Sequence, residues 1–129
     1  MRTVLIISAL VAAAVGIGTL FFPHAFHATT GITLDGPNLL SEVRAAGGGV
    51  LAAAFLMGLG AFRRGFAVPA ALTGAVLYLG YGLARLYGAA VDGLPAAPLV
   101  AATVAELVLG VACVLVARHP SGGRAVYHA

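Results

Sequence analysis

The sequence predicts an all-α fold, a transmembrane four-helix bundle whose two termini both lie on the cytoplasmic side. Hydrophobic residues make up 61% of the 129 residues and charged residues only 9%, which is far outside the range of soluble globular proteins. Four long apolar runs hold nearly the whole chain, and four spans of about 20 residues each leave no room for an extramembrane domain. The arginines near the ends of these runs fall on one side. We therefore expect a single membrane domain over residues 1–129.

The first helix is predicted over residues 3–22, which contain no charged side chain. This run is longer than the apolar region of a cleavable signal peptide, which spans about 7 to 15 residues. Cleavage after Ala28 would also place Phe26 where a small residue is needed. We expect an uncleaved helix, followed by an outer loop over residues 23–41.

The second and third helices are predicted to form a tight hairpin. The second begins after Ser41, a good N-cap, and covers residues 42–62. Glu42 in its first turn suits the helix dipole. A turn at residues 63–65 leads into the third helix, which covers residues 66–88.

The fourth helix follows a loop with strong turn signals. Residues 89–97 include Asp92 and Gly93, and the helix is predicted over residues 98–117. Residues 118–129 are polar and Gly-rich, so we expect a short frayed tail.

The placement of arginine predicts the orientation in the membrane. Five arginines lie on one side of the predicted bundle: Arg2, Arg63, Arg64, Arg118 and Arg124. No arginine lies in the loops on the opposite side. Because cytoplasmic loops carry the excess of basic residues, both termini should be cytoplasmic, with Asp35 and Asp92 outside. All seven basic residues are Arg, and Ala and Gly abound, which hints at a GC-rich bacterial genome. We expect the cytoplasmic (inner) membrane of a bacterium.

Glycine density predicts close packing between helices. In lipid no hydrophobic force drives helices together, so small residues that let backbones approach closely carry much of the packing. The positions expected to do this are Gly47, Gly48, Gly49, Gly58, Gly80 and Gly82. Two interpretations stay open: the glycines pack within the bundle, or one small-residue face docks another membrane protein. Helical spacing alone does not separate them.

The candidate site is a set of polar residues in the outer half of the bundle: Arg44, Tyr78, Tyr81, Arg85, Thr103 and Glu106. A bare carboxylate at the depth of Glu106 is costly, so it must face the bundle and be paired. Helical side chains lean toward their own N-terminus, which tilts Arg85 and Glu106 toward each other. We expect an ion pair flanked by hydroxyls. It either specifies helix register or forms a binding or proton-handling site.

Other chemistry is not expected. His24 and His27 are spaced for two metal ligands, but no second His/Cys pair follows and Cys113 is the only cysteine, so we predict no metal and no cofactor. No hydrolase elbow, phosphate loop or zinc-protease motif occurs, and we expect no enzyme activity. The arginines sit at membrane boundaries rather than on a folded basic face, which argues against a nucleic-acid partner.

Several of these motifs together suggest a family. The segments are Ser41-Glu42-Val43-Arg44 leading into Gly47-Gly48-Gly49, then Gly82-Leu83-Ala84-Arg85, Asp92-Gly93-Leu94-Pro95 and Glu106. Over roughly residues 4–118 the chain resembles the bacterial four-helix membrane proteins catalogued as domain of unknown function 4345. The resemblance marks Arg44, Gly48, Arg85, Asp92, Gly93 and Glu106 as counterparts. It implies a four-helix bundle in the cytoplasmic membrane and no established reaction. A looser likeness to the quinone-linked DoxX-type proteins is architectural only.

Three function classes follow. The first is an accessory or structural subunit that contacts membrane lipids and stabilises or tunes a larger membrane complex, since the loops are short and small residues abound. A transporter such as an MCE-type lipid importer would be a reasonable host, although no residue selects it. The alternative is a lipid- or quinone-binding protein with an Arg85/Glu106 site. A pocket that touches Tyr78, Arg85 and Glu106 would favour that alternative, whereas a direct, solidly packed pair would disfavour it. A drug/proton exchanger ranks last, because Arg85 would hold the carboxylate ionised.

Overall fold

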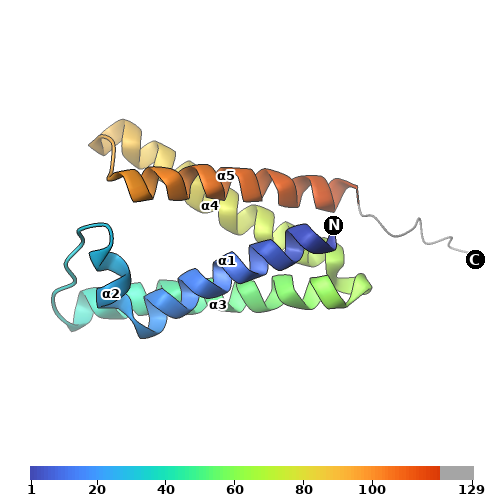
Figure 1. The fold of residues 1–129 in the computed structure, drawn as a ribbon, viewed down its shortest axis with the longest axis horizontal. Coiled ribbons are helices and arrows are strands. Elements are labelled where there is room, and N and C mark those ends of the chain that lie inside the picture. The colour runs from blue at the N-terminus through green and yellow to red at the C-terminus, as the bar shows by residue number, and fades with distance from the viewer. Residues whose placement is uncertain (120–129) are drawn as a thin grey trace, which may run out of the picture.

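The computed structural model describes residues 1–119, and this part is helical with no strand (Figure 1). Four of its helices are long and apolar enough to cross a membrane: α1 (Arg2–Phe21), α3 (Pro37–Phe62), α4 (Ala67–Asp92) and α5 (Ala97–Arg118). Two short elements complete it, α2 (Pro23–Ala28) and the 3-10 helix η1 (Arg64–Phe66). The predicted all-α class with four apolar helices is confirmed. The predicted tail beyond residue 119, which includes Arg124, lies outside the described residues.

Two predicted helix boundaries were wrong. α3 begins at Pro37, inside the predicted outer loop, because Gly36 takes a positive φ of 85° and Pro37 fits the first turn of a helix. Ser41 is therefore not the N-cap, and Glu42 is not in the first turn. The predicted end of the third helix at residue 88 was also wrong, because α4 continues to Asp92 and stops at Gly93, whose φ is 97°.

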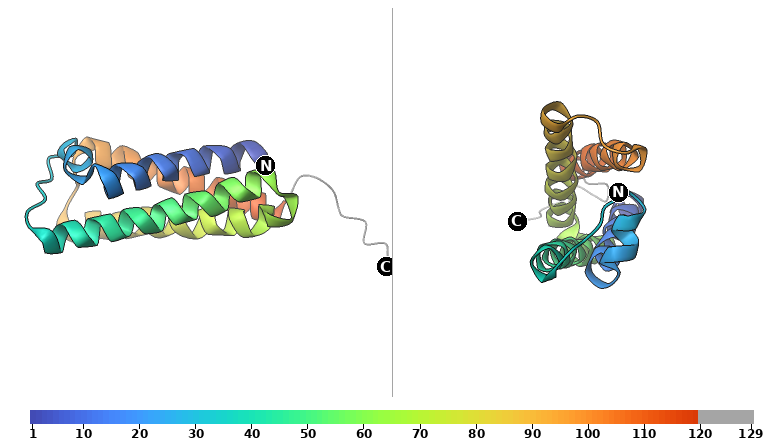
Figure 2. Two further views of the ribbon diagram at one scale, coloured as in Figure 1. Left: turned by 90° about the horizontal axis from the view of Figure 1, so that it is seen from below. Right: turned by 90° about the vertical axis from the view of Figure 1, so that its left-hand side faces the viewer.

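The helices form two antiparallel pairs. α1 lies along α3, and α5 lies along α4, as Figures 1 and 2 both show. The pairs are joined mainly where α3 meets α4, whereas α1 makes few contacts with α4 or α5. The end-on view in Figure 2 shows the two pairs one above the other. The bundle is thus a pair of hairpins with one weakly closed side, between α1 and α5.

Close approach within each pair depends on a few glycines. A Cβ on Gly16 would lie 2.8 Å from the backbone nitrogen of Leu51, and a Cβ on Gly47 would lie 2.8 Å from that of Leu20. These two positions let α1 and α3 touch backbone to backbone. Between α4 and α5, the missing side chain of Gly82 leaves room for the side chain of Leu107.

The other predicted packing glycines behave differently. A Cβ on Gly58 would make only ordinary contact with Ala9, at 3.9 Å. Nothing lies within 4 Å of a Cβ on Gly48, Gly49 or Gly80, so these three do not pack within the described chain. The sequence showed which residues are small but not the rotation of each helix, and that rotation decides which of them face a neighbour.

The buried core lies toward the end of the bundle where α1 begins, and at mid-length. One buried cluster joins all four long helices and consists of Leu5, Ala61, Ala67, Ala70, Ala71 and Val116. A second lies at mid-length and consists of Ala12, Val50, Ala54, Met57 and Tyr78. Beyond it, α4 has no buried residue after Gly82, and α5 has none before Thr103. The α4–α5 pair is therefore loosely packed toward the end that holds residues 29–36 and 93–96, which we call the loop end.

Candidate functional site

An ion pair joins α4 and α5 in the loosely packed half. Arg85 Nε donates to both carboxylate oxygens of Glu106, at 3.0 Å and 3.2 Å. The helices run in opposite directions and their side chains lean toward their own N-termini, so the two side chains meet as the sequence predicts. It is the one ion pair between side chains in residues 1–119. The Arg85 side chain stays 34% exposed and that of Glu106 16% exposed, so the pair is not sealed in the core.

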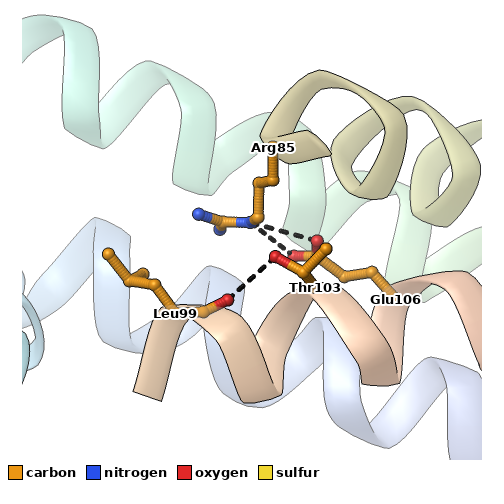
Figure 3. Close-up of polar contacts among 4 residues, drawn as sticks. All are labelled: Arg85, Leu99, Thr103 and Glu106. Carbon is orange, nitrogen blue, oxygen red and sulfur yellow. Dashed lines mark hydrogen bonds and ion pairs between the residues drawn. The ribbon is translucent and has the colours of Figure 1, made fainter. Parts of the chain in front are cut away.

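Arg85 uses only part of its donor capacity on this partner. Figure 3 shows its two terminal nitrogens on the side away from the Glu106 carboxylate. The hydrogen bonds of Arg85 to described residues come from Nε alone. A guanidinium has five N–H donors in a planar fork, and the four on the terminal nitrogens are the ones that grip a phosphate or carboxylate from its end. Arg85 can therefore bind Glu106 and a second oxygen-bearing group at once.

The hydroxyls expected to flank the pair bond elsewhere. Thr103 Oγ1 donates to the carbonyl oxygen of Leu99 at 2.9 Å, the usual back-bond of threonine within a helix (Figure 3). The Tyr78 hydroxyl donates to the carbonyl oxygen of Ser8 at 2.5 Å, across to α1. Tyr81 remains 39% exposed. The expected hydroxyl shell around the ion pair is thus absent in the described part of the chain.

Arg44 is also separate from the pair. Its Nη1 donates to the carbonyl oxygen of Leu20 at 2.5 Å and so joins α3 to the last turn of α1. The predicted set of six residues is therefore not one cluster. It comprises the α4–α5 ion pair, an α4–α1 contact and an α3–α1 contact, because neighbouring positions on a helix face different partners.

A second polar group lies deeper, and the sequence analysis missed its central member. Ser8 is fully buried on α1, and its Oγ lies 3.4 Å from the Sγ of Cys113 on α5. Together with Tyr78 these residues connect three helices. Ser8, Ala12 and Gly16 are spaced four apart on α1, and that stripe of small residues was the available signal for the packed face of the helix.

A pocket of about 120 Å³ is lined both by the ion pair and by Tyr78 of the deeper group. Arg85, Glu106, Tyr78 and Tyr81 are its polar lining residues. Its remaining walls are apolar and come from all four long helices: Val11, Ala12 and Val15 of α1, Val50 of α3, Leu77 of α4, and Ala102, Ala105 and Leu109 of α5. An apolar chamber with a few convergent polar groups is the usual form of a small-molecule site.

The remaining candidate residues are not near the pocket. Asp92 ends α4, and Gly93 follows it at the exposed loop end. His27 Nδ1 donates to the carbonyl oxygen of Pro23 at 2.9 Å, within the short α2. Among residues 1–119 no three His, Cys, Asp or Glu side chains gather in a geometry that could hold a metal ion.

Comparison with known proteins gives one match. A family model described as "Domain of unknown function (DUF4345)" matches residues 1–117, which is nearly the whole chain. No curated protein and no solved structure matches the chain.

Proposed function

This chain belongs to the DUF4345 family, and on that premise we propose that it is a multi-pass membrane protein that binds one amphiphile, a lipid or a quinone, between its helix pairs. The family carries no assigned reaction, so the proposal depends on the site. The observation that carries it is the pocket that touches Tyr78, Arg85 and Glu106 together.

The chemistry of the pocket fits an amphiphile. The terminal nitrogens of Arg85 can donate to a phosphate, carboxylate or quinone oxygen while Glu106 keeps the guanidinium in place. The apolar walls suit a ring or a segment of hydrocarbon chain. The weakly closed side between α1 and α5 supplies a route from the bilayer. The function proposed is binding, and no catalytic step is assigned.

The ion pair by itself has a simpler explanation, namely that it specifies the register of α4 against α5. A pair with only that role needs no chamber beside it and no spare donors. Here the pair is direct, yet it lies on the wall of a pocket, and a third of the Arg85 side chain stays accessible. These features favour a ligand site over register alone.

The test is to block the pocket without touching the ion pair. Ala102 lines the pocket, whereas its neighbour Ala101 is exposed and does not. Protein purified in mild detergent should retain a stoichiometric amphiphile, identified by mass spectrometry of extracted lipids and quinones. Ala102→Leu should lose it and Ala101→Leu should keep it. Equal retention by both variants, or no bound amphiphile in the unmodified protein, would overturn the proposal.

A second candidate, an accessory subunit of a larger membrane complex, is supported by a different surface. Gly49 and Ala52 on α3, and Gly80 and Ala84 on α4, are exposed. A Cβ on either glycine would meet nothing within 4 Å. Such small-residue faces suit close approach by a helix of another protein.

This candidate has its own experiment. Affinity purification in mild detergent should recover a membrane partner in stoichiometric amount, and a transporter such as an MCE-type lipid importer is the first host to examine. Gly80→Leu should release the partner without changing amphiphile retention. Gly65→Leu, another exposed glycine with open space around it but outside the long helices, is the control. Recovery of no partner, or equal recovery by both variants, would count against this candidate.

A further inference from the structure

The four described arginines near the helix ends gather at one end of the bundle, which we call the basic end. Arg2 begins α1, Arg63 and Arg64 follow α3, and Arg118 ends α5, and these segments meet at the end where the N-terminus lies (Figure 1). None of them has a carboxylate partner among residues 1–119, where the one ion pair is Arg85–Glu106. The N-termini of α1 and α4 and the C-termini of α3 and α5 lie at this end, so the helix dipoles offset one another and the positive charge comes from the arginines.

Two of these arginines line a pocket. It measures about 240 Å³, and its walls include Arg2 of α1, Arg64 of η1, and Gly60 and Phe62 of α3. The Arg2 guanidinium carbon lies 5.0 Å from the centre of the Phe62 ring, which is cation–π distance. Arg63 and Arg118 are at the same end but do not line this pocket. Two guanidinium groups around one cavity, neither with a carboxylate partner among residues 1–119, form a site for a phosphate group.

The same phenylalanine continues into an apolar groove. A groove of about 440 Å³ runs between α1 and α3 and is lined by residues such as Ile6, Leu10, Phe55 and Phe62. Phe62 is common to the polar pocket and to the groove. Because α1 and α3 are long enough to span the bilayer, the pocket lies at the depth of lipid headgroups and the groove at the depth of acyl chains. A free phosphate ion would use only the first of these two surfaces.

We propose that the basic end binds one anionic phospholipid, with its phosphate between Arg2 and Arg64 and one acyl chain in the groove between α1 and α3. This site uses different residues from the Arg85 pocket and does not depend on the function proposed above. Basic pockets between transmembrane helices are suited to anionic lipid headgroups on electrostatic grounds. The lipid would cover the Phe62 ring and join the two helices at the membrane surface.

The experiment is native mass spectrometry of the full chain in mild detergent, titrated with phosphatidylglycerol. Arg2→Gln/Arg64→Gln removes the two pocket arginines, and Arg63→Gln/Arg118→Gln removes the same charge from the same end outside the pocket. The first double variant should bind phosphatidylglycerol about 30-fold more weakly. The second should lose less than about 3-fold, because separated exposed charges are screened. Equal losses would show diffuse attraction and would overturn the site.

Two further arms identify the source of the phosphate and control for folding. Phosphatidylcholine with the same acyl chains should bind more weakly than phosphatidylglycerol, and glycerol 3-phosphate or inorganic phosphate should not displace the lipid at equal concentration. Equal binding of phosphatidylcholine would contradict the charge argument, and displacement by a free phosphate would contradict the acyl groove. Arg2→Lys/Arg64→Lys keeps the charge and should retain most of the binding. Loss of binding in that variant as large as in the glutamine variant would also overturn the proposal.

Discussion

At the scale of single residues, two of the polar contacts within the bundle link α4 to different helices. Arg85 and Glu106 neutralise each other between α4 and α5, and Tyr78 bonds to the backbone of α1 at Ser8. In a medium of low dielectric, an unpaired polar group costs more than a formed pair contributes. Each contact is therefore best tested by removing one partner at a time.

A double-mutant cycle tests the ion pair. Arg85→Leu and Glu106→Leu should each destabilise the protein by about 3 kcal/mol, because each leaves an uncompensated charge, whereas the double variant should lose less than the sum. The measurement is the shift of the unfolding midpoint in one detergent. Additive losses would mean that the two side chains do not interact, and Glu106 would then need a separate role.

The Tyr78 hydroxyl can be removed with little change of shape. Tyr78→Phe should cost about 1 kcal/mol, because it deletes the hydrogen bond between α4 and α1 and retains the buried ring. Tyr87→Phe is the control, since Tyr87 is 72% exposed. Equal unfolding midpoints for the two variants would show that this hydrogen bond does not hold α4 against α1.

At the scale of helices, backbone contact between α1 and α3 is the main packing device. Gly16 and Gly47 leave no room for a methyl group there, whereas Gly48 and Gly49, the next residues of α3, face open space. One helix thus carries adjacent glycines with opposite roles. The difference follows from a rotation of about 100° per residue around the helix axis.

Gly47→Ala and Gly49→Ala form a matched pair for this contact. Gly47→Ala should destabilise by about 1–3 kcal/mol, because its Cβ would meet the backbone of Leu20. Gly49→Ala should be neutral or slightly stabilising, since alanine is the better helix former. Unfolding midpoints in the same detergent provide the comparison. A loss at Gly49 as large as that at Gly47 would contradict the packing described for α3.

At the scale of the whole molecule, charge is distributed unevenly between the two ends. The basic end carries Arg2, Arg63, Arg64 and Arg118, whereas Asp35 and Asp92 lie at the loop end (Figure 1). In a membrane this asymmetry favours a cytoplasmic basic end. The loop end, where the core stops and the Arg85 pocket lies nearer, would then face the outer side.

Cysteine labelling in intact cells tests that orientation. Asp35→Cys and Asp92→Cys should react with a membrane-impermeant maleimide from outside, because both positions are exposed at the loop end. Arg63→Cys should react only after permeabilisation. Cys113 is fully buried and should contribute little background. Labelling of the two aspartate positions only after permeabilisation would reverse the assignment.

Much of the architecture and the central pair could be predicted without coordinates. Four apolar helices follow from hydropathy, which is a property of each segment alone. The meeting of Arg85 and Glu106 follows from the opposite directions of two consecutive helices, because side chains lean toward the helix N-terminus. The first inference needs no knowledge of how each helix is rotated about its axis. The second needs in addition that a carboxylate within the membrane faces the bundle and is paired.

Only the tertiary structure decided which faces meet. The contact of Tyr78 with Ser8, the separation of Arg44 from the ion pair, and the division of the glycines into packed and open positions all depend on helix rotation and crossing. The pocket beside Arg85 depends in addition on where the core stops, beyond the Tyr78 cluster. These features arise from the packing of all side chains at once. The sequence by itself therefore determined the four apolar helices and the Arg85–Glu106 ion pair, whereas the tertiary structure determined the pocket beside that pair.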